Sequence, residues 1–285
     1  MRLGSLIPCL VMATSTLVEA ATITVPFELA ADEVFVRGRV NGSEWLWFSV
    51  DSGASSMILD AARARRLGFA SGEQRQGRGA GAGGVTYTKL EPQLDLAIAD
   101  SKSSGYSFIS IDLSGPAGNA GHAMDGILGF EFLSRFVVTI DYRHGTMTLD
   151  DPADFQEPRG STMLPLEIVS KLPFITATIK VPGVAAETSR FLIDTGSADA
   201  VDHPIIKKSS GKVRRSVTGV GLGKTTIGWI GNAEYLKLGP YTIRKPITAC
   251  CGGNEFNQMM IGAAILERFV VTFDYSHRRF YLRLN

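Results

Sequence analysis

Two short segments of the chain place an acidic residue, a hydroxyl residue and a glycine directly after an apolar run. Residues 48–53 read FSVDSG and residues 191–196 read FLIDTG. A single Asp-Ser-Gly or Asp-Thr-Gly after a strand is an ordinary turn, in which the carboxylate caps backbone amides. If the two turns met in space, Asp51 and Asp194 would share one proton. One carboxyl could then act as a general base on a water molecule and the other as a general acid.

An internal repeat provides a way to bring the two turns together. Three matched pairs of segments occur in the same order and with similar separations: 25–29 with 164–168, 48–53 with 191–196, and 128–142 with 261–275. This self-similarity predicts a duplicated unit. A pseudo-twofold axis between the copies can place equivalent turns face to face. Glycine would permit the close approach, and the hydroxyls of Ser52 and Thr195 could bond across the axis.

Both halves have the composition of β-structure. Short runs rich in Val, Ile, Phe and Tyr are separated by Gly, Pro, Asn and Asp, while helical patterning is limited to segments 59–69 and 130–136. The sequence therefore predicts an all-β fold of two barrel-like lobes related by a pseudo-twofold, with a few short helices. We place the N-terminal lobe at 21–150, a Pro-, Asp- and Gly-containing linker at 151–161, and the C-terminal lobe at 162–285.

The chain resembles the aspartic peptidases of the pepsin and retropepsin-like superfamily, and it looks most like two bacterial retropepsin-like lobes in one chain. The resemblance rests on the two turns and on the apolar-apolar-Gly elements ILG at 127–129 and MIG at 260–262. It covers nearly all of the chain after the first 20 residues. It implies that Asp51 and Asp194 form an acid-protease dyad. The supporting residues that it implies are Ser52, Gly53, Gly129, Thr195, Gly196 and Gly262.

The resemblance also implies a β-hairpin flap between each turn and its apolar-apolar-Gly element. Residues 77–90 and 219–231 occupy the corresponding places, and their aromatic candidates are Tyr87 and Trp229. Each aromatic could instead pack on its own lobe, and both alternatives stay open. The glycines of the first segment would allow a mobile tip.

The predicted function is that of an aspartic endopeptidase, which would need no cofactor or metal ion and would act on peptides or proteins. Since both turns lie in one chain, we expect a monomer. One departure is that Asp199 and Asp202 follow the second turn, where the first copy has Ser56 and Leu59. Extra acids could shift the titration of the dyad, or the second lobe could have changed its function. The alternative is therefore a non-catalytic or partner-dependent peptide-binding module with the same fold.

Composition argues against other kinds of partner. With 29 basic and 28 acidic residues, the formal net charge is +1, so the chain has no excess of positive charge that would attract nucleic acid. Residues 219–226, GVGLGKTT, lack the spacing of a phosphate-binding loop, so we expect no nucleotide. The four histidines lack metal-ligand spacing and are expected at the surface or in loops. The basic run at 207–215 predicts a solvated loop, with a contact to an anionic polymer or membrane surface as the alternative.

The N-terminus predicts export. Arg2, the apolar stretch after it and the small residues near Ala20 are typical of a secretory signal over residues 1–20, which indicates a periplasmic or secreted protein. The alternative is a retained N-terminal anchor, the one membrane contact that we expect. The adjacent Cys250 and Cys251 favour two thiols, because neighbouring residues lie too close for an ordinary disulfide. A disulfide between neighbours in an oxidising compartment is the alternative.

Overall fold

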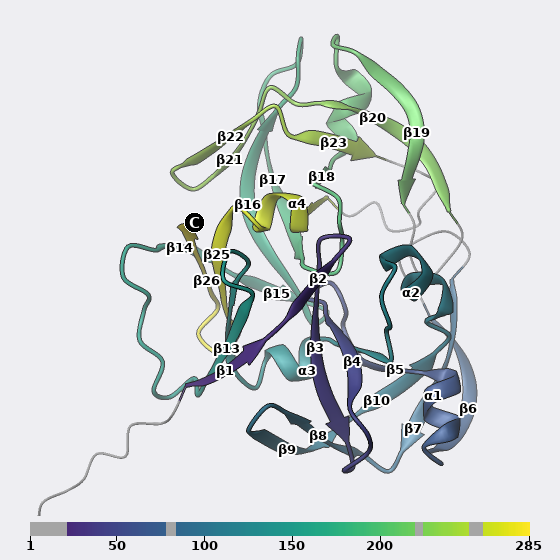
Figure 1. Cartoon of the computed structure of the whole chain (residues 1–285). Helices are drawn as coiled ribbons and strands as arrows, with labels where there is room; N and C mark the ends of the chain where they lie inside the picture. The colour runs from purple at the N-terminus through teal and green to yellow at the C-terminus, as the bar shows by residue number, and fades with distance from the viewer. Residues whose placement is uncertain (1–21, 78–83, 220–224, 251–258) are drawn as a thin grey trace, which may run out of the picture.

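The structure is a computed structural model that describes residues 22–77, 84–219, 225–250 and 259–285. Its described part is built mainly of strands, in two ten-stranded sheets and one six-stranded sheet (Figure 1). Each ten-stranded sheet comes from one half of the chain. The predicted all-β fold with duplicated lobes is confirmed.

The N-terminal sheet has the strand order β6-β7-β10-β5-β11-β4-β3-β8-β9, with β2 paired to β3. Its strands are β2 (Glu28–Ala30), β3 (Glu33–Val40), β4 (Leu46–Val50), β5 (Met57–Asp60), β6 (Ala70–Gly77), β7 (Val85–Glu91), β8 (Leu94–Ile98), β9 (Ser101–Tyr106), β10 (Phe108–Ile111) and β11 (Gly126–Leu128).

The C-terminal sheet repeats this order as β19-β20-β23-β18-β24-β17-β16-β21-β22, with β15 paired to β16. Its strands are β15 (Glu167–Val169), β16 (Leu172–Lys180), β17 (Glu187–Asp194), β18 (Val201–Asp202), β19 (Val213–Gly219), β20 (Thr226–Asn232), β21 (Tyr235–Leu238), β22 (Tyr241–Arg244), β23 (Ile247–Cys250) and β24 (Met260–Gly262). Every strand of one sheet therefore has a counterpart in the other, as a duplicated unit requires.

The helices are short. They are α1 (Ala61–Arg66), α2 (Ser114–Ala120), α3 (Phe130–Leu133), α4 (Ala263–Leu266) and the 3₁₀-helix η1 (Pro204–Lys208). Asp60 caps α1 by accepting a hydrogen bond from the Arg63 amide. The helical segments expected within 59–69 and 130–136 contain α1 and α3, whereas α2, with its two glycines and a proline, carried no helical signal.

The six-stranded sheet joins the two halves. Its order is β1-β13-β12-β25-β26-β14, from β1 (Ile23–Pro26), β12 (Val137–Asp141), β13 (Thr146–Asp150), β14 (Thr162–Pro165), β25 (Phe269–Asp274) and β26 (Arg279–Leu284). At its centre β12 pairs with β25, so that Thr139 lies opposite Thr272 and their hydroxyls bond at 2.8 Å. These two threonines are equivalent in the repeat, so the pseudo-twofold axis passes between them.

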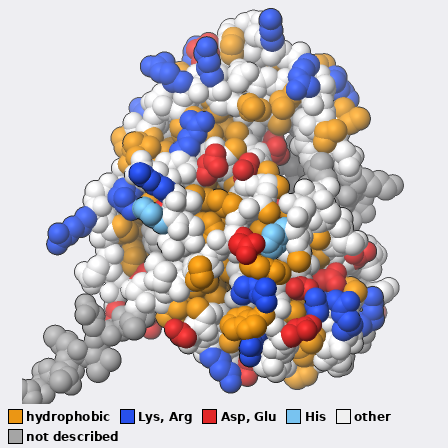
Figure 2. Space-filling model, viewed as in Figure 1, with side chains coloured by type: hydrophobic (Ala, Val, Ile, Leu, Met, Phe, Trp, Pro, Cys, Tyr) orange, Lys and Arg blue, Asp and Glu red, His pale blue; other side chains and the backbone are white. Residues whose placement is uncertain are grey.

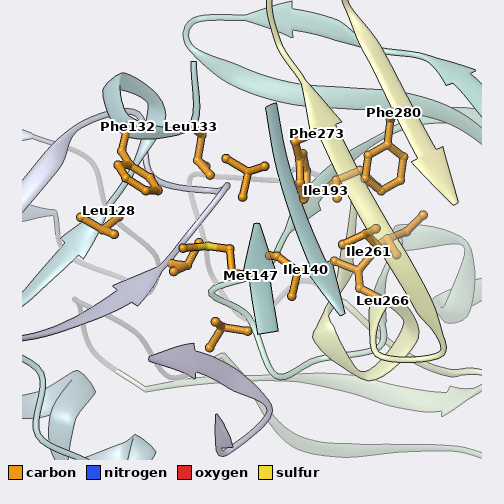
Figure 3. Packing of buried hydrophobic residues seen from close by; sticks show 14 of the residues in the cluster. Leu128, Phe132, Leu133, Ile140, Met147, Ile193, Ile261, Leu266, Phe273 and Phe280 are labelled. Carbon is orange, nitrogen blue, oxygen red and sulfur yellow. The ribbon is translucent and has the colours of Figure 1, made fainter. Parts of the chain in front are cut away.

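One apolar core extends through both lobes and the shared sheet. Figure 3 shows Leu128 and Phe132 on the N-terminal side of it and Ile193 and Phe280 on the C-terminal side. Among the helices that the structure describes, none is long and apolar enough to cross a membrane.

Truncating Phe273 is expected to test how much this shared core contributes to stability. The Phe273 ring is fully buried and packs against Tyr275 and Phe280, with ring centroids 6.2 and 4.9 Å away. Phe273→Ala should lower the free energy of unfolding by about 3–5 kcal/mol, because it leaves a cavity in the core. The control Leu284→Ala, at a side chain that is 56% exposed, should change it by less than about 0.5 kcal/mol. Urea unfolding followed by circular dichroism measures both, and equal losses would contradict the expectation.

Candidate active site

Each lobe delivers its Asp-(Ser/Thr)-Gly turn from a central strand held by an apolar-apolar-Gly strand. In the N-terminal lobe β11 lies between β4, which it pairs in parallel, and β5, which it pairs antiparallel. The C-terminal lobe has the same arrangement, with β24 between β17 and β18. The Asp51 amide donates to Leu128 O at 3.1 Å, and the Gly262 amide donates to Ala200 O at 3.1 Å. These bonds anchor the start of the first turn and the end of the second turn, each to the apolar-apolar-Gly strand of its own lobe.

The two turns are joined to each other by four hydrogen bonds. The Ser52 amide donates to Thr195 Oγ1 and the Thr195 amide donates to Ser52 Oγ, both at 3.0 Å. Each hydroxyl also donates across the interface, Ser52 to Ile193 O and Thr195 to Val50 O, both at 2.7 Å. Ser52 and Thr195 are each 1% exposed. Because these bonds are buried and fully reciprocal, they hold the lobes in one relative position.

The glycines of the turns allow the two backbones to approach. A Cβ atom on Gly53 would overlap the Asp194 carboxyl, and one on Gly196 would overlap the Asp51 carboxyl. Gly129 and Gly262 meet backbone carbonyls instead: a Cβ on Gly129 would lie 2.6 Å from Ala54 O. A Cβ on Gly262 would lie 2.7 Å from Ser197 O. All eight residues predicted from the sequence for the dyad and its support thus lie in one place.

The two carboxyls face each other at this junction. Each accepts a hydrogen bond within its own turn, from Gly53 N at 2.7 Å for Asp51 and from Gly196 N at 2.9 Å for Asp194. Burial and, to a smaller extent, the charge of Glu33 together raise the pKa of Asp51 to about 6, against the opposing effect of its hydrogen bond with Asp194. Burial also raises the pKa of Asp194 well above its ordinary value, as does the charge of Asp51. Both shifts disfavour the state in which the two carboxyls are ionised together.

Two residues near the dyad were not found from the sequence. Glu33 starts β3 and accepts a hydrogen bond from Ser49 Oγ at 3.2 Å; burial raises its pKa to about 7. Tyr275 has a buried hydroxyl with no hydrogen-bond partner among the described residues. Burial raises the pKa of this hydroxyl well above its usual value, and the charges of Asp51 and Asp194 raise it to a smaller extent. Both depend on contacts between distant segments, so no local pattern signals them.

The C-terminal lobe adds two acids beside the dyad. Burial raises the pKa of Asp199, and it raises the pKa of Asp202 to about 8, with further contributions from the charges of Asp199 and Asp194. The N-terminal lobe has no acid at the equivalent positions of its turn, which residues 54–58 fill with Ala, Ser, Ser, Met and Ile. The surroundings of the dyad are therefore chemically asymmetric, although the strands that carry it are not.

The flap candidates lie on hairpins at one edge of the molecule, β6–β7 and β19–β20 (Figure 1). Tyr87 on β7 packs against a small apolar cluster of its own lobe. Trp229 on β20 packs against the main core, and the Arg215 guanidinium lies 5.2 Å from its ring centroid. Hairpin residues 78–83 and 220–224 lie outside the described part, so a role for either aromatic at the substrate stays a prediction.

His203 lies in the link between β18 and η1, as expected of a loop histidine, but it is buried, and its Nδ1 accepts a hydrogen bond from Ile205 N at 3.1 Å. Two other minor expectations need correction. Cys250 is disulfide-bonded and buried, so the expectation of a free thiol there was wrong; Cys251 lies outside the described residues. The basic run at 207–215 is mostly exposed, but it forms the end of η1 and the start of β19 as well as a loop. Among the described residues, no cluster of His, Cys, Asp and Glu could hold a metal ion.

Comparison with known proteins bears on the N-terminal lobe. Residues 36–132, from β3 to α3, match the family model of aspartyl proteases. No curated protein matches the chain. The matched segment contains Asp51, its turn and the supporting strand β11. The chain is therefore similar to aspartyl proteases over this lobe, and the match supports an aspartyl protease family and a peptidase type of hydrolase.

Proposed function

We propose that this protein is a two-lobed aspartic endopeptidase in which Asp51 and Asp194 activate water between them. The observation that carries the proposal is the buried carboxyl pair, held at the lobe junction by the reciprocal bonds of Ser52 and Thr195. Two carboxyls so placed share a proton, which supplies a base and an acid at one point without a metal ion or a covalent intermediate.

The proposed reaction uses each carboxyl once as a base and once as an acid. The ionised carboxyl takes a proton from water as the water oxygen bonds to the peptide carbonyl carbon, while the protonated carboxyl donates to the carbonyl oxygen. The C–N bond then breaks as the carboxyl that took the water proton donates it to the nitrogen, while the other carboxylate takes a proton from a hydroxyl of the tetrahedral intermediate, which becomes the carboxylic acid product. The dyad is thereby returned to its singly protonated state.

Cleavage of a diverse peptide library by the purified protein tests this function. We expect endoproteolytic cleavage that a statine-type inhibitor blocks and that neither a chelator nor a thiol reagent affects. The inhibitor places a hydroxyl where the attacked carbonyl would be, so it reports on the dyad directly. A well-folded protein that cleaves no peptide at any pH would reject the function.

The pH dependence of kcat/KM gives a second test. Below a pH of about 6 both carboxyls are protonated and no base is present, so activity is lost as pH falls through this value. Activity is also lost at high pH, when the pKa of Asp194 is passed and the acid disappears. We expect a bell-shaped profile with its maximum above pH 6. A maximum below pH 4, with no loss of rate there, would contradict the proposed environment of the pair.

A non-catalytic or partner-dependent peptide-binding module is the second candidate. The observation that favours it is the family match, which ends at residue 132 and leaves the C-terminal lobe with its two extra acids unmatched. Such a module would bind statine peptides but show no turnover of the library. Single-turnover assays with the candidate partner present separate it from an enzyme.

Export, the monomeric state and the lobe boundaries at 21–150 and 162–285 belong to the same proposal. Residues 1–21 lie outside the described part of the chain, so the signal over 1–20 rests on the sequence. N-terminal sequencing of the protein recovered from the periplasm or the medium tests export, and a mature start at Ala21 is expected.

A further inference from the structure

The register of the strands gives Asp202 an apolar counterpart in the other lobe. β18 pairs with β24 so that Asp202 lies opposite Met260, and β5 pairs with β11 so that Ile58 lies opposite Ile127. Met260 and Ile127 begin the equivalent MIG and ILG elements. Asp202 is therefore the counterpart of Ile58, whereas alignment of the two sequence copies had placed it opposite Leu59. The second turn contains one residue more than the first.

Asp202 lies on the face of the sheet that is turned away from the main core. Its neighbour Val201 is fully buried in that core, and side chains alternate between the faces of a strand. The counterpart Ile58 belongs to a separate apolar cluster on the equivalent face, against which Ala54 of the first turn packs. In the C-terminal lobe this face carries the Asp202 carboxyl, which lies close enough to Asp194 for the charge of Asp194 to raise its pKa.

Among the described residues, the carboxyl of Asp202 has no hydrogen-bond or ion-pair partner. Its Oδ1 atom is buried and accepts no hydrogen bond in the described part of the protein. None of the ion pairs formed by described residues includes Asp199 or Asp202. The charged groups that act on Asp202 are Asp199 and Asp194, both acidic. His203, next in sequence, faces the other way, toward Phe191 and Glu187.

Buried carboxylates in proteins are normally paired with a cation or a metal ion, because an unpaired buried charge is costly. Here the two acids lie beside the dyad, where the proposed function places a peptide. Acidic and apolar side chains lie together near the middle of one face of the molecule, between the two lobes (Figure 2). A basic side chain of a bound peptide would supply the missing positive charge and the missing hydrogen-bond donor at once.

We propose that Asp199 and Asp202 form an acidic subsite on the C-terminal side of the dyad, which binds a lysine or arginine side chain next to the scissile bond. The apolar counterpart around Ile58 makes the site asymmetric, so that only one side of the bond carries the basic preference. This inference rests on the proposed function, because it assumes that a peptide lies across the dyad.

Binding of statine peptides to the purified protein tests the subsite without requiring turnover. Each peptide carries lysine or the uncharged norleucine at one position, either directly before or directly after the statine. Fluorescence anisotropy at pH 8 gives the Kd of each peptide. At one position lysine should bind about 10–100-fold tighter, since a hydrogen bond to a charged group is lost with norleucine. Asp202→Asn should reduce this ratio to about threefold or less, and Asp202→Ile should favour norleucine.

The control is Asp100→Asn, an exposed aspartate in the turn between β8 and β9, which should keep the native ratio. Equal binding of lysine and norleucine at every position would overturn the subsite, as would a preference that survives both Asp199→Asn and Asp202→Asn. Failure of every peptide to bind would also overturn it. Hydrolysis of the library without a basic preference would reject the subsite and leave the proposed function standing. A lysine preference in binding without hydrolysis of any peptide would support the subsite and reject the proposed function.

Discussion

Replacing either Asp51 or Asp194 by asparagine is expected to lower kcat/KM by about a thousandfold or more. Asparagine keeps the shape of the side chain and can still accept the amide bond of Gly53 or Gly196. It cannot carry the shared proton, so each variant lacks either the base or the acid of the pair. Steady-state assays on the best peptide from the library measure the loss. Activity that survives in Asp194→Asn would mean that the repeat does not build the site.

The same variants should remain folded, and this distinguishes lost chemistry from lost structure. Both carboxyls have raised pKa values in the folded protein, so they contribute stability below the unfolded pKa of about 4 that is lost as pH rises. For Asp51 the loss is complete as pH passes about 6. At pH 8 the asparagine variants should therefore be at least as stable as the native protein. Urea unfolding at pH 4 and pH 8 checks this, with Asp100→Asn as the control, and a destabilised variant at pH 8 would contradict the expected sign.

Removing the hydroxyl of Thr195 is expected to have the largest effect on stability among the polar substitutions in the site. Thr195→Val keeps the volume of the side chain but leaves the Ser52 amide and the Val50 carbonyl without their partners in a buried place. Each of these two unpaired groups costs about 1–3 kcal/mol, so the free energy of unfolding should fall by about 2–6 kcal/mol. Urea unfolding measures this loss. Activity should fall as well, because the turns no longer hold the carboxyls in alignment.

Thr188→Val is the matched control on the same strand, β17. Its hydroxyl bonds to that of Thr178 at 2.8 Å in an exposed place, where water can replace the bond. The control should lose less than about 1 kcal/mol. If the two variants were equally stable, the bonds across the junction would not be what couples the lobes. The hydroxyl of Ser52 makes the reciprocal contacts, so Ser52→Ala should resemble Thr195→Val in direction.

Local pattern and repetition in the sequence were enough to predict much of this molecule. Two Asp-(Ser/Thr)-Gly turns after apolar strands, each followed by an apolar-apolar-Gly element, predicted that Asp51 and Asp194 would meet, and the structure brings them together. The matched segments also predicted two duplicated lobes, and the two ten-stranded sheets have the same strand order. Turn residues and strand periodicity are properties of neighbouring residues, and a duplication repeats them, so both could be recognised without coordinates.

Only the tertiary structure decided how the copies are joined and what surrounds the dyad. The pairing of β12 with β25 makes a sheet from both halves, yet nothing in either strand specifies the other as its partner. Glu33 and Tyr275 approach the dyad through packing between distant segments. Counting along the sequence from each turn aligned Asp202 with Leu59, whereas the strand register makes Ile58 its equivalent in the other lobe. The second turn has one extra residue, and one extra residue moves every later side chain to the other face of the sheet. Contacts of this kind depend on how whole sheets pack against each other, and the sequence of a short segment does not specify that packing.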